Sequence, residues 1–374
     1  MLTKDEVILR AREIGFADIG FTTTEEFSSQ RQILEERAAG YEWAEARGLN
    51  LMEGVSPLAL YPEAKSMIVV LENYHQYSFP TTLLGKFGRC YLDDDRVTKD
   101  GLAVKIKALR SFLRDHGIDS KVPAYIPHRL AAARAGVGNF GKNNLLYATR
   151  TARQSSWVLP VVLLVNQEFA PDTPHITMGC PEWCRNVCIA ACPTRALTGA
   201  GKIDPRRCIS YLTYYGEGIT PLEFREPMGT WIYGCDRCQT VCPRNEAWLA
   251  QDLPLNPRVV AKDSAFALPK LLAMDENYFR EKIWPHMFYM SARNIWRWKM
   301  NVARAMGNSR DPSNVPYLIK AFAENEDERV QGMIAWALGR LGGQEARTTL
   351  TSWQAQAEGM VQEEISNALL GLTK

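Results

Sequence analysis

The chain has 374 residues, 46% of them hydrophobic and 23% charged, an ordinary composition for a soluble globular protein of two or three domains. Its formal net charge of +2 excludes a strong global attraction to nucleic acid. No apolar run approaches the ~20 residues that a membrane-spanning helix needs, and the N-terminus lacks an apolar core of signal-peptide length. We therefore expect a cytoplasmic protein without a membrane partner.

Helices and strands alternate over the first part of the chain. Residues 3–15 predict an amphipathic helix capped by Thr3, and residues 102–113 predict a second helix. Apolar runs rich in β-branched residues are typical of strands buried on both faces. The predicted strands lie at residues 17–23, 66–71 and 157–165. This alternation predicts an α/β domain over residues 1–170.

The C-terminal part has helical periodicity throughout. Asp311 and Pro312 predict the start of a helix, and three stripes of apolar residues follow at helical spacing. Helices of this length in antiparallel pairs are typical of HEAT-type repeats, and a plain helical bundle is the alternative. We predict an all-α, HEAT-type domain over residues 256–374.

Eight of the nine cysteines fall into two groups, each ending in Cys-Pro. The groups are Cys180, Cys184, Cys188 and Cys192, and Cys208, Cys235, Cys238 and Cys242. Thiolates at short spacing closed by Cys-Pro are typical of cubane clusters, and in two-cluster ferredoxins the cysteine before proline ligates the other cluster. Eight thiolates fit two [4Fe–4S] clusters. Residues 171–255 therefore predict a two-cluster ferredoxin-like segment in an electron-transfer protein.

Zinc and disulfides are the alternatives for these cysteines. Zinc usually takes thiolates from two Cys-x2-Cys pairs, and only Cys235 and Cys238 have that spacing. Disulfides need an oxidising compartment. The first group, CPEWCRNVCIAACP, departs from the common Cys-x2-Cys-x2-Cys-x3-Cys-Pro run, which predicts a longer loop around its cluster and makes Cys180 the least typical ligand. Cys90 stands alone and is expected to be a buried thiol.

A basic, aromatic segment lies at the start of the helical part. Residues 276–310 carry seven Lys or Arg and two Glu, with tryptophans and other aromatic residues interleaved. Cations set among aromatic rings suit phosphates and unpaired bases. The alternative is an interdomain seam, with the aromatic residues in the core and the charges in solvent.

Four stretches of the chain, in the right order, resemble the epoxyqueuosine reductase family. They are ARAGVGNFGKNN (133–144), RRCISYLT (206–213), YGCDRCQTVCPRN (233–245) and the helical stretch 301–343. The resemblance implies a cobalamin-binding α/β domain, a two-cluster ferredoxin segment and a HEAT-type domain. It also implies the last step of queuosine synthesis in tRNA, with tRNA contacts through residues 276–310 and the helical domain, and an external low-potential electron donor.

The resemblance further implies how the cysteines and the cofactor side are used. It assigns Cys180, Cys184, Cys188 and Cys242 to the first cluster, and Cys192, Cys208, Cys235 and Cys238 to a second cluster beside the cobalamin. On the corrinoid side it places Gly136, Gly138, Lys142, Asn143, Ser210 and Asp236. For the glycines the alternative is a tight turn that needs a positive φ.

Two departures from the family fall at the substrate end. The family has a carboxylate, its proposed proton donor, shortly before the Gly-rich loop, and residues 121–129 (KVPAYIPHR) contain none. The family's Asp-Tyr-His motif is also missing from residues 93–101. Tyr125 and His128 are the candidate replacements as general acid, and His is the better matched near neutral pH.

The predicted function is thus an iron–sulfur, corrinoid-dependent reductase resembling epoxyqueuosine reductase. One alternative is a paralogous reductase of a different, smaller substrate. The other is a non-catalytic electron-transfer protein that reduces a partner's corrinoid.

Overall fold

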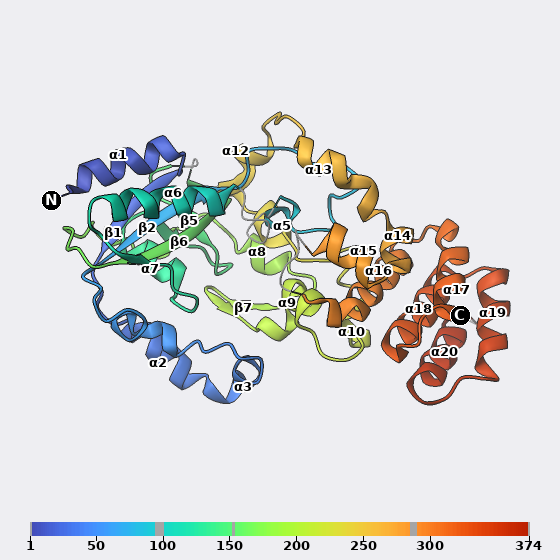
Figure 1. Cartoon of the computed structure of the whole chain (residues 1–374). Coiled ribbons are helices and arrows are strands. Elements are labelled where there is room, and N and C mark those ends of the chain that lie inside the picture. The colour runs from blue at the N-terminus through green and yellow to red at the C-terminus, as the bar shows by residue number, and fades with distance from the viewer. Residues whose placement is uncertain (1, 94–100, 152–153, 285–289, 373–374) are drawn as a thin grey trace.

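The structure, a computed structural model, describes residues 2–93, 101–151, 154–284 and 290–372. An α/β part lies at the N-terminal end and a stack of helices at the C-terminal end, with the cysteine-rich segment between them (Figure 1). Most of the 93–101 stretch, where the sequence lacks a family motif, falls outside the described residues. None of the described helices has both the length and the apolar character needed to cross a bilayer.

A four-stranded sheet forms the centre of the N-terminal part, in the order β1-β2-β6-β3 with every neighbouring pair antiparallel. Its strands are β1 (Asp18–Thr22), β2 (Ser66–Asn73), β6 (Val158–Val165) and β3 (Ser120–Lys121). The three predicted strands are therefore confirmed. The first six residues of β2 and the last five of β6 are buried, as expected for strands covered on both faces.

Helices cover the two faces of this sheet and make a core on each side. On one face α1 (Lys4–Ile14) and α6 (Leu102–Asp115) pack against Ile68 and Leu163. On the other, α7 (His128–Arg134) packs against Val69 and Val162. The predicted Thr3 cap of α1 is confirmed as a capping box, because Thr3 Oγ1 accepts from Glu6 N–H and the Glu6 carboxylate accepts from Thr3 N–H.

Smaller elements complete the N-terminal part. They are α2 (Ser28–Glu36), α3 (Glu42–Glu45), α4 (Pro57–Leu60), α5 (Arg89–Leu92), β4 (Gly138–Phe140) and β5 (Leu146–Ala148). The strands β4 and β5 pair as an antiparallel hairpin directly after α7. This hairpin carries the Gly-rich stretch toward the cysteine-rich segment.

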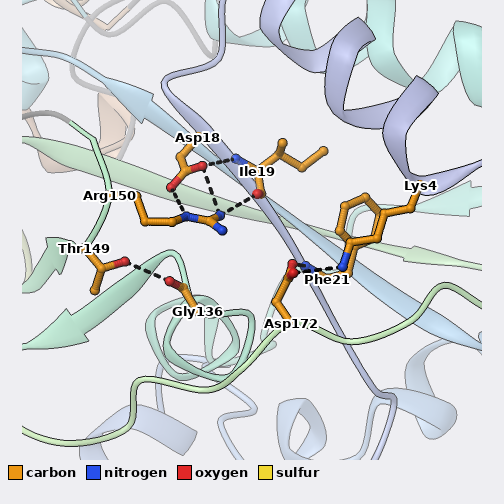
Figure 2. A network of polar contacts seen from close by, with 8 residues as sticks. All are labelled: Lys4, Asp18, Ile19, Phe21, Gly136, Thr149, Arg150 and Asp172. Carbon is orange, nitrogen blue, oxygen red and sulfur yellow. Dashed lines mark hydrogen bonds and ion pairs between the residues drawn. The ribbon is translucent and has the colours of Figure 1, made fainter.

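Ion pairs fix strand β1 and the turn beside it (Figure 2). Asp18 accepts from Arg150 at 3.1 Å, and Asp172 accepts from Lys4 Nζ at 2.8 Å and from the Phe21 N–H at 2.8 Å. The neighbouring Thr149 hydroxyl donates to the Gly136 carbonyl at 2.7 Å. These contacts set the position of the turn between α7 and β4.

Short helices connected by turns form the cysteine-rich segment and its continuation. They are α8 (Val187–Ala190), α9 (Ile209–Tyr214), α10 (Leu222–Arg225), α11 (Arg237–Thr240), α12 (Glu246–Leu249), α13 (Pro257–Lys262), α14 (Leu268–Ala273) and α15 (Glu276–Tyr278), with the paired strands β7 (Leu197–Gly199) and β8 (Lys202–Ile203). Helices α8 and α11, one from each cysteine group, contact each other.

Five helices form the C-terminal stack: α16 (Ile295–Ser309), α17 (Val315–Ala323), α18 (Glu328–Leu341), α19 (Gln344–Gln354) and α20 (Gly359–Gly371). Helix α18 packs between α16 and α20, α17 packs against α18, and α19 packs against α18 and α20. A bidentate ion pair at 2.6 Å between Arg225 of α10 and Glu364 of α20 ties this stack to the cysteine-rich segment.

Candidate iron–sulfur and substrate site

The thiols of the first cysteine group have a neighbour from the second group. Burial raises the pKa of Cys188, and the thiols of Cys242, Cys180 and Cys184 raise that pKa further. Because Coulomb interactions weaken with distance, this coupling places Cys242 beside the first group. Such a crossing is what the Cys-Pro ends predict.

The remaining four thiols are coupled in the same way. Burial raises the pKa of Cys238, and Cys208 and Cys192 are among the charges that raise it further. Cys188 also contributes, so the two sets are adjacent. The first thiol set is Cys180, Cys184, Cys188 and Cys242, and the second thiol set is Cys192, Cys208, Cys235 and Cys238. Within the described residues, no three His, Cys, Asp or Glu side chains converge tightly enough to bind a single metal ion. The ligand sets stay a prediction, which these neighbours support.

Two residues expected at a corrinoid instead contact the cysteine segments. The Lys142 N–H donates to Cys180 Sγ at 3.3 Å, and its ammonium donates to the Cys184 carbonyl at 3.2 Å. The buried Asn143 amide donates to the Tyr147 hydroxyl oxygen at 3.0 Å and to the Cys238 carbonyl at 3.1 Å. These contacts tie the Gly-rich stretch to the cysteine segments, and contact of Lys142 and Asn143 with a corrinoid stays a prediction.

Helix α9 supplies hydrogen bonds to the second thiol set. Burial raises the pKa of Cys208, while hydrogen bonds from the Ser210 and Tyr211 N–H groups and the Ser210 hydroxyl lower it. Asp236, also expected at the corrinoid, is buried and accepts from the Arg89 N–H at 2.7 Å. Burial raises the pKa of Asp236 to about 6. Ser210 thus faces a candidate ligand, whereas the Asp236 carboxylate faces helix α5.

The two glycines of the Gly-rich loop differ in what a side chain there would meet. Gly136 has φ 70°, and a Cβ there would lie 2.5 Å from the Thr173 carbonyl oxygen. A Cβ on Gly138 would lie 2.6 Å from Leu146 Cδ1. The tight-turn alternative therefore explains Gly136, whereas Gly138 lies in β4 and has no positive φ. A role for either glycine at a corrinoid stays a prediction.

The two candidate proton donors differ in their surroundings. The Tyr125 hydroxyl is partly exposed and donates to the Gly48 carbonyl at 3.1 Å. His128 Nδ1 accepts from the Val162 N–H of β6 at 3.2 Å, and burial lowers the pKa of His128 to about 4. At neutral pH this imidazole is uncharged. This favours Tyr125 over His128 as the proton donor, and both assignments stay predictions.

Trp43 lies beside the second thiol set, and Arg129 lies near Tyr41, although no sequence motif indicates either position. Arg129 is exposed, and its guanidinium donates to the Asn144 carbonyl. Trp43 of α3 packs edge-on against Tyr211 of α9, with 4.8 Å between ring centroids, and belongs to the apolar cluster that contacts Cys208. The segment around Trp43 is polar, so only the tertiary fold brings it here.

Cys90 belongs to helix α5, the helix that the Asp236 carboxylate faces. It is half-buried rather than buried, and it lines a cavity of ≈ 300 Å³ with Tyr74 and Arg89. The sequence expectation of a fully buried thiol is wrong.

Some cations of the basic segment 276–310 are buried where the helical stack meets the cysteine-rich segment, and others lie on the surface. Arg297 and Arg304 are buried in α16, where they donate to the Gly216, Gly229 and Trp231 carbonyls. These carbonyls belong to the stretch between Cys208 and Cys235. The seam alternative is therefore correct for both arginines, and the RNA-binding prediction is wrong for them. Lys282, Arg293 and Arg310 are exposed, whereas Phe288 and Tyr289 lie outside the described residues.

Comparisons with known proteins agree with this arrangement. A family model described as a 4Fe-4S double cluster binding domain matches residues 180–245, and one described as HEAT repeats matches residues 296–369. Epoxyqueuosine reductase from Bacillus subtilis is 32% identical over 91% of this chain and 88% of its own length. The enzyme from Listeria monocytogenes is 30% identical over 97% of this chain and 96% of its own length.

Solved structures match over the whole chain. The crystal structure of epoxyqueuosine reductase with an epoxyqueuosine-modified tRNA-Tyr stem loop has a TM-score of 0.83 at 29% identity, over 99% of both chains. The Streptococcus thermophilus epoxyqueuosine reductase has a TM-score of 0.80 at 25% identity, over 100% of both chains. With its double-cluster segment, its HEAT repeats and relatives of 30% identity or more over nearly its full length, this chain belongs to the epoxyqueuosine reductase family.

Proposed function

We propose that this protein reduces epoxyqueuosine in tRNA to queuosine, using electrons that pass through two [4Fe–4S] clusters. The observation that carries the proposal is the full-length match to a reductase crystallised with an epoxyqueuosine-modified tRNA stem loop. The eight thiols in two adjacent sets support the electron path.

The ligand sets follow the crossed grouping of the thiols. Cys180, Cys184, Cys188 and Cys242 would hold the first cluster, and Cys192, Cys208, Cys235 and Cys238 the second. The donor chemistry fits, since each set supplies four thiolates. Backbone and side-chain donors to Cys180, Cys208 and Cys242 would offset the negative charge of ligated clusters.

We also propose a corrinoid beside the second cluster. The observation that supports this fit is the aromatic pair Trp43 and Tyr211, which lies next to Cys208. Ser210, Arg129 and these rings are the residues of this chain that would face it. When bound, a corrinoid supplies a cobalt centre of low valence for reductive chemistry.

Converting an epoxide to an alkene with loss of water takes two electrons and two protons, so the protein must supply a proton near the substrate. Tyr125 is the candidate for this step, because its hydroxyl is partly exposed and lies in the stretch where the family's carboxylate is absent. His128 stays neutral and orients the loop through β6. A positioned general acid contributes about 10²–10⁴-fold to rate.

One observation favours a second candidate function, reduction of a different and smaller substrate. Residues 121–129 hold no carboxylate, although the cluster segment is complete. A paralogue with a changed substrate would retain the electron path and lose the original acid.

Nucleoside analysis of tRNA from a bacterial host that lacks its own epoxyqueuosine reductase separates the two candidates. A host expressing this chain should accumulate queuosine, and the Tyr125→Phe variant should leave most tRNA with epoxyqueuosine. Unchanged epoxyqueuosine with the wild-type chain, although its clusters are assembled, would favour the smaller-substrate paralogue.

A further inference from the structure

Three exposed apolar side chains each stand directly before a cysteine of the first thiol set. They are Trp183, Val187 and Val241, which are 68%, 37% and 40% exposed, and they precede Cys184, Cys188 and Cys242. The three cysteines themselves are buried, at 5–9% exposure. Apolar surface is therefore presented to solvent immediately around the thiols of the first set.

A single exposed apolar residue is ordinary on a protein surface, but several exposed apolar side chains around one buried group mark an interaction site. Val187 belongs to α8, and Val241 ends α11, the two helices that contact each other across the thiol sets. Helix α8 lies near the middle of the molecule in Figure 1. Trp183 is the most exposed of the three, and tryptophan is the residue type most enriched at interface centres.

The charge around this apolar group has one predominant sign. Residues 176–196 and 237–244 carry four arginines and a single carboxylate, Glu182. Arg185, Arg195 and Arg237 are exposed, whereas Arg244 is held by the Gly179 carbonyl at 2.9 Å and lies over the Tyr147 ring. A ligated cluster adds negative charge behind these guanidinium groups. An approaching partner meets the exposed arginines first.

The second thiol set presents a different environment. Cys208 and Cys235 contact the apolar cluster of Tyr211 and Trp43, on the side of the α/β part. That side is the one where substrate chemistry is proposed. The first set is therefore the natural point at which electrons arrive from outside the molecule.

We propose that Trp183, Val187 and Val241, with the rim of Arg185, Arg195 and Arg237, form the docking surface for a small acidic electron-transfer protein. The inference rests on the proposed function in that the first thiol set holds a [4Fe–4S] cluster. Each encounter moves one electron, so the carrier is oxidised by one electron and the first cluster is reduced by one, with no bond made or broken. Electron-transfer complexes are small and weak, which suits an apolar centre of three side chains and steering by charge.

Stopped-flow reduction of the clusters by two probes tests this surface without any tRNA or corrinoid. The first probe is a reduced acidic flavodoxin, and the second is dithionite, which needs no docking surface. Trp183→Ala should lower the second-order rate with flavodoxin about tenfold, the loss of one interface anchor. Arg185→Glu with Arg237→Glu should lower it further at low salt and flatten its salt dependence. Rates with dithionite should be unchanged.

Matched controls come from the opposite end of the chain. Leu9→Ala removes an apolar side chain that is 59% exposed on α1, and Arg12→Glu reverses an exposed charge of the same helix. Both should leave the flavodoxin rate unchanged. The affinity of oxidised flavodoxin for the oxidised protein, measured by calorimetry, should fall in the Trp183 and arginine variants alone.

An unchanged flavodoxin rate in the Trp183 variant, or an equal slowing with both reductants, would overturn the proposal. So would a Trp183 variant that loses affinity for a tRNA stem loop but keeps its flavodoxin rate, since the surface would then bind RNA. Failure of epoxyqueuosine turnover leaves these rates as they are and bears on the proposed function only. Absence of any cluster reducible by dithionite would contradict both.

Discussion

Tyr147 donates its hydroxyl hydrogen bond to Cys242 Sγ at 3.1 Å, and both side chains are buried. Asn143 donates to the Tyr147 oxygen at 3.0 Å and so fixes the direction of that hydroxyl. Cys242 is the cysteine that crosses from the second motif to the first thiol set. The hairpin after α7 thus reaches the cysteine that we propose as the ligand joining the two motifs.

Removing this hydroxyl should change the potential of the first cluster. Hydrogen bonds to ligand sulfur favour the more negative, reduced state and raise the reduction potential. Tyr147→Phe should lower the potential of one cluster by about 20–60 mV, the equivalent of one hydrogen bond for a one-electron couple. Redox titration followed by electron paramagnetic resonance measures it. Tyr278→Phe, which removes a hydroxyl bonded to the Ala265 carbonyl at 2.7 Å, is the control, and equal potentials in both variants would refute the prediction.

The crossed ligand sets predict which cluster each cysteine variant loses. Cys192→Ser should remove the second cluster and leave the first, although its nearest neighbours in sequence bind the first. Iron analysis should fall from about eight to about four per chain, and the remaining spectrum should match that of Cys238→Ser. Cys90→Ser should keep both clusters. A Cys192 variant whose spectrum matches that of Cys188→Ser would show that the motifs do not cross.

Binding of tRNA should depend on the exposed cations of the 276–310 segment. Lys282→Ala with Arg293→Ala should weaken binding of a tRNA stem loop and reduce the slope of log K against log salt by about 1 to 2, since each phosphate that the protein no longer neutralises removes about 0.7–0.9. Arg12→Ala, an exposed cation on α1, is the control. A salt-dependence slope that is the same for the double variant and the wild type would place the tRNA interface elsewhere.

His75 makes stability depend on pH. It is buried between Trp157 and Trp248, at 5.0 and 5.7 Å between ring centroids, and neither ring nitrogen has a hydrogen-bond partner among the described residues. Burial, with the nearby Arg89 charge, lowers the pKa of His75 to about 4. The unfolded chain, with an ordinary histidine pKa near 6.5, then binds the proton more readily than the folded protein as pH falls.

The contribution of His75 to stability is therefore present above the unfolded pKa and is lost as pH falls toward 4. Between pH 7 and pH 5 the loss amounts to about 2 kcal/mol. The His75→Phe variant has no imidazole to protonate. Between pH 7 and pH 5 its free energy of unfolding in denaturant should therefore fall by about 2 kcal/mol less than that of the wild type. Parallel pH profiles for the variant and the wild type would show that His75 is charged in the folded protein.

Local patterns in the sequence were sufficient to predict the main helices and strands. The spacing of apolar residues located α1, β1, β2, β6 and α6, because these segments bury one helical stripe or a continuous strand. The same periodicity indicated the C-terminal helices. The cysteine spacing indicated the double-cluster segment, since iron–sulfur ligation restricts which residue types can serve and how they are spaced.

Tertiary contacts account for what the sequence did not reveal. Arg297 and Arg304 lie in a segment whose composition suits an RNA-binding surface, but their guanidinium groups donate hydrogen bonds to backbone carbonyls of the stretch before Cys235. Asn143 lies in the Gly-rich motif, and its amide is used to orient Tyr147. The low pKa of His128 arises from burial against β6. The partners of both arginines and of His128 are far away in sequence, and although Tyr147 is only four residues from Asn143, no motif indicates that contact.

Epoxyqueuosine turnover by the purified protein tests the central claim most directly. The protein would be prepared anaerobically with both clusters and cobalamin, reduced chemically, and given tRNA that carries epoxyqueuosine. Mass spectrometry of the digested tRNA should show queuosine formed by the wild type, slower formation by Tyr125→Phe and none by Cys238→Ser. Intact epoxyqueuosine after prolonged incubation of the wild type, with its clusters demonstrably reduced, would contradict the account and point to a different substrate.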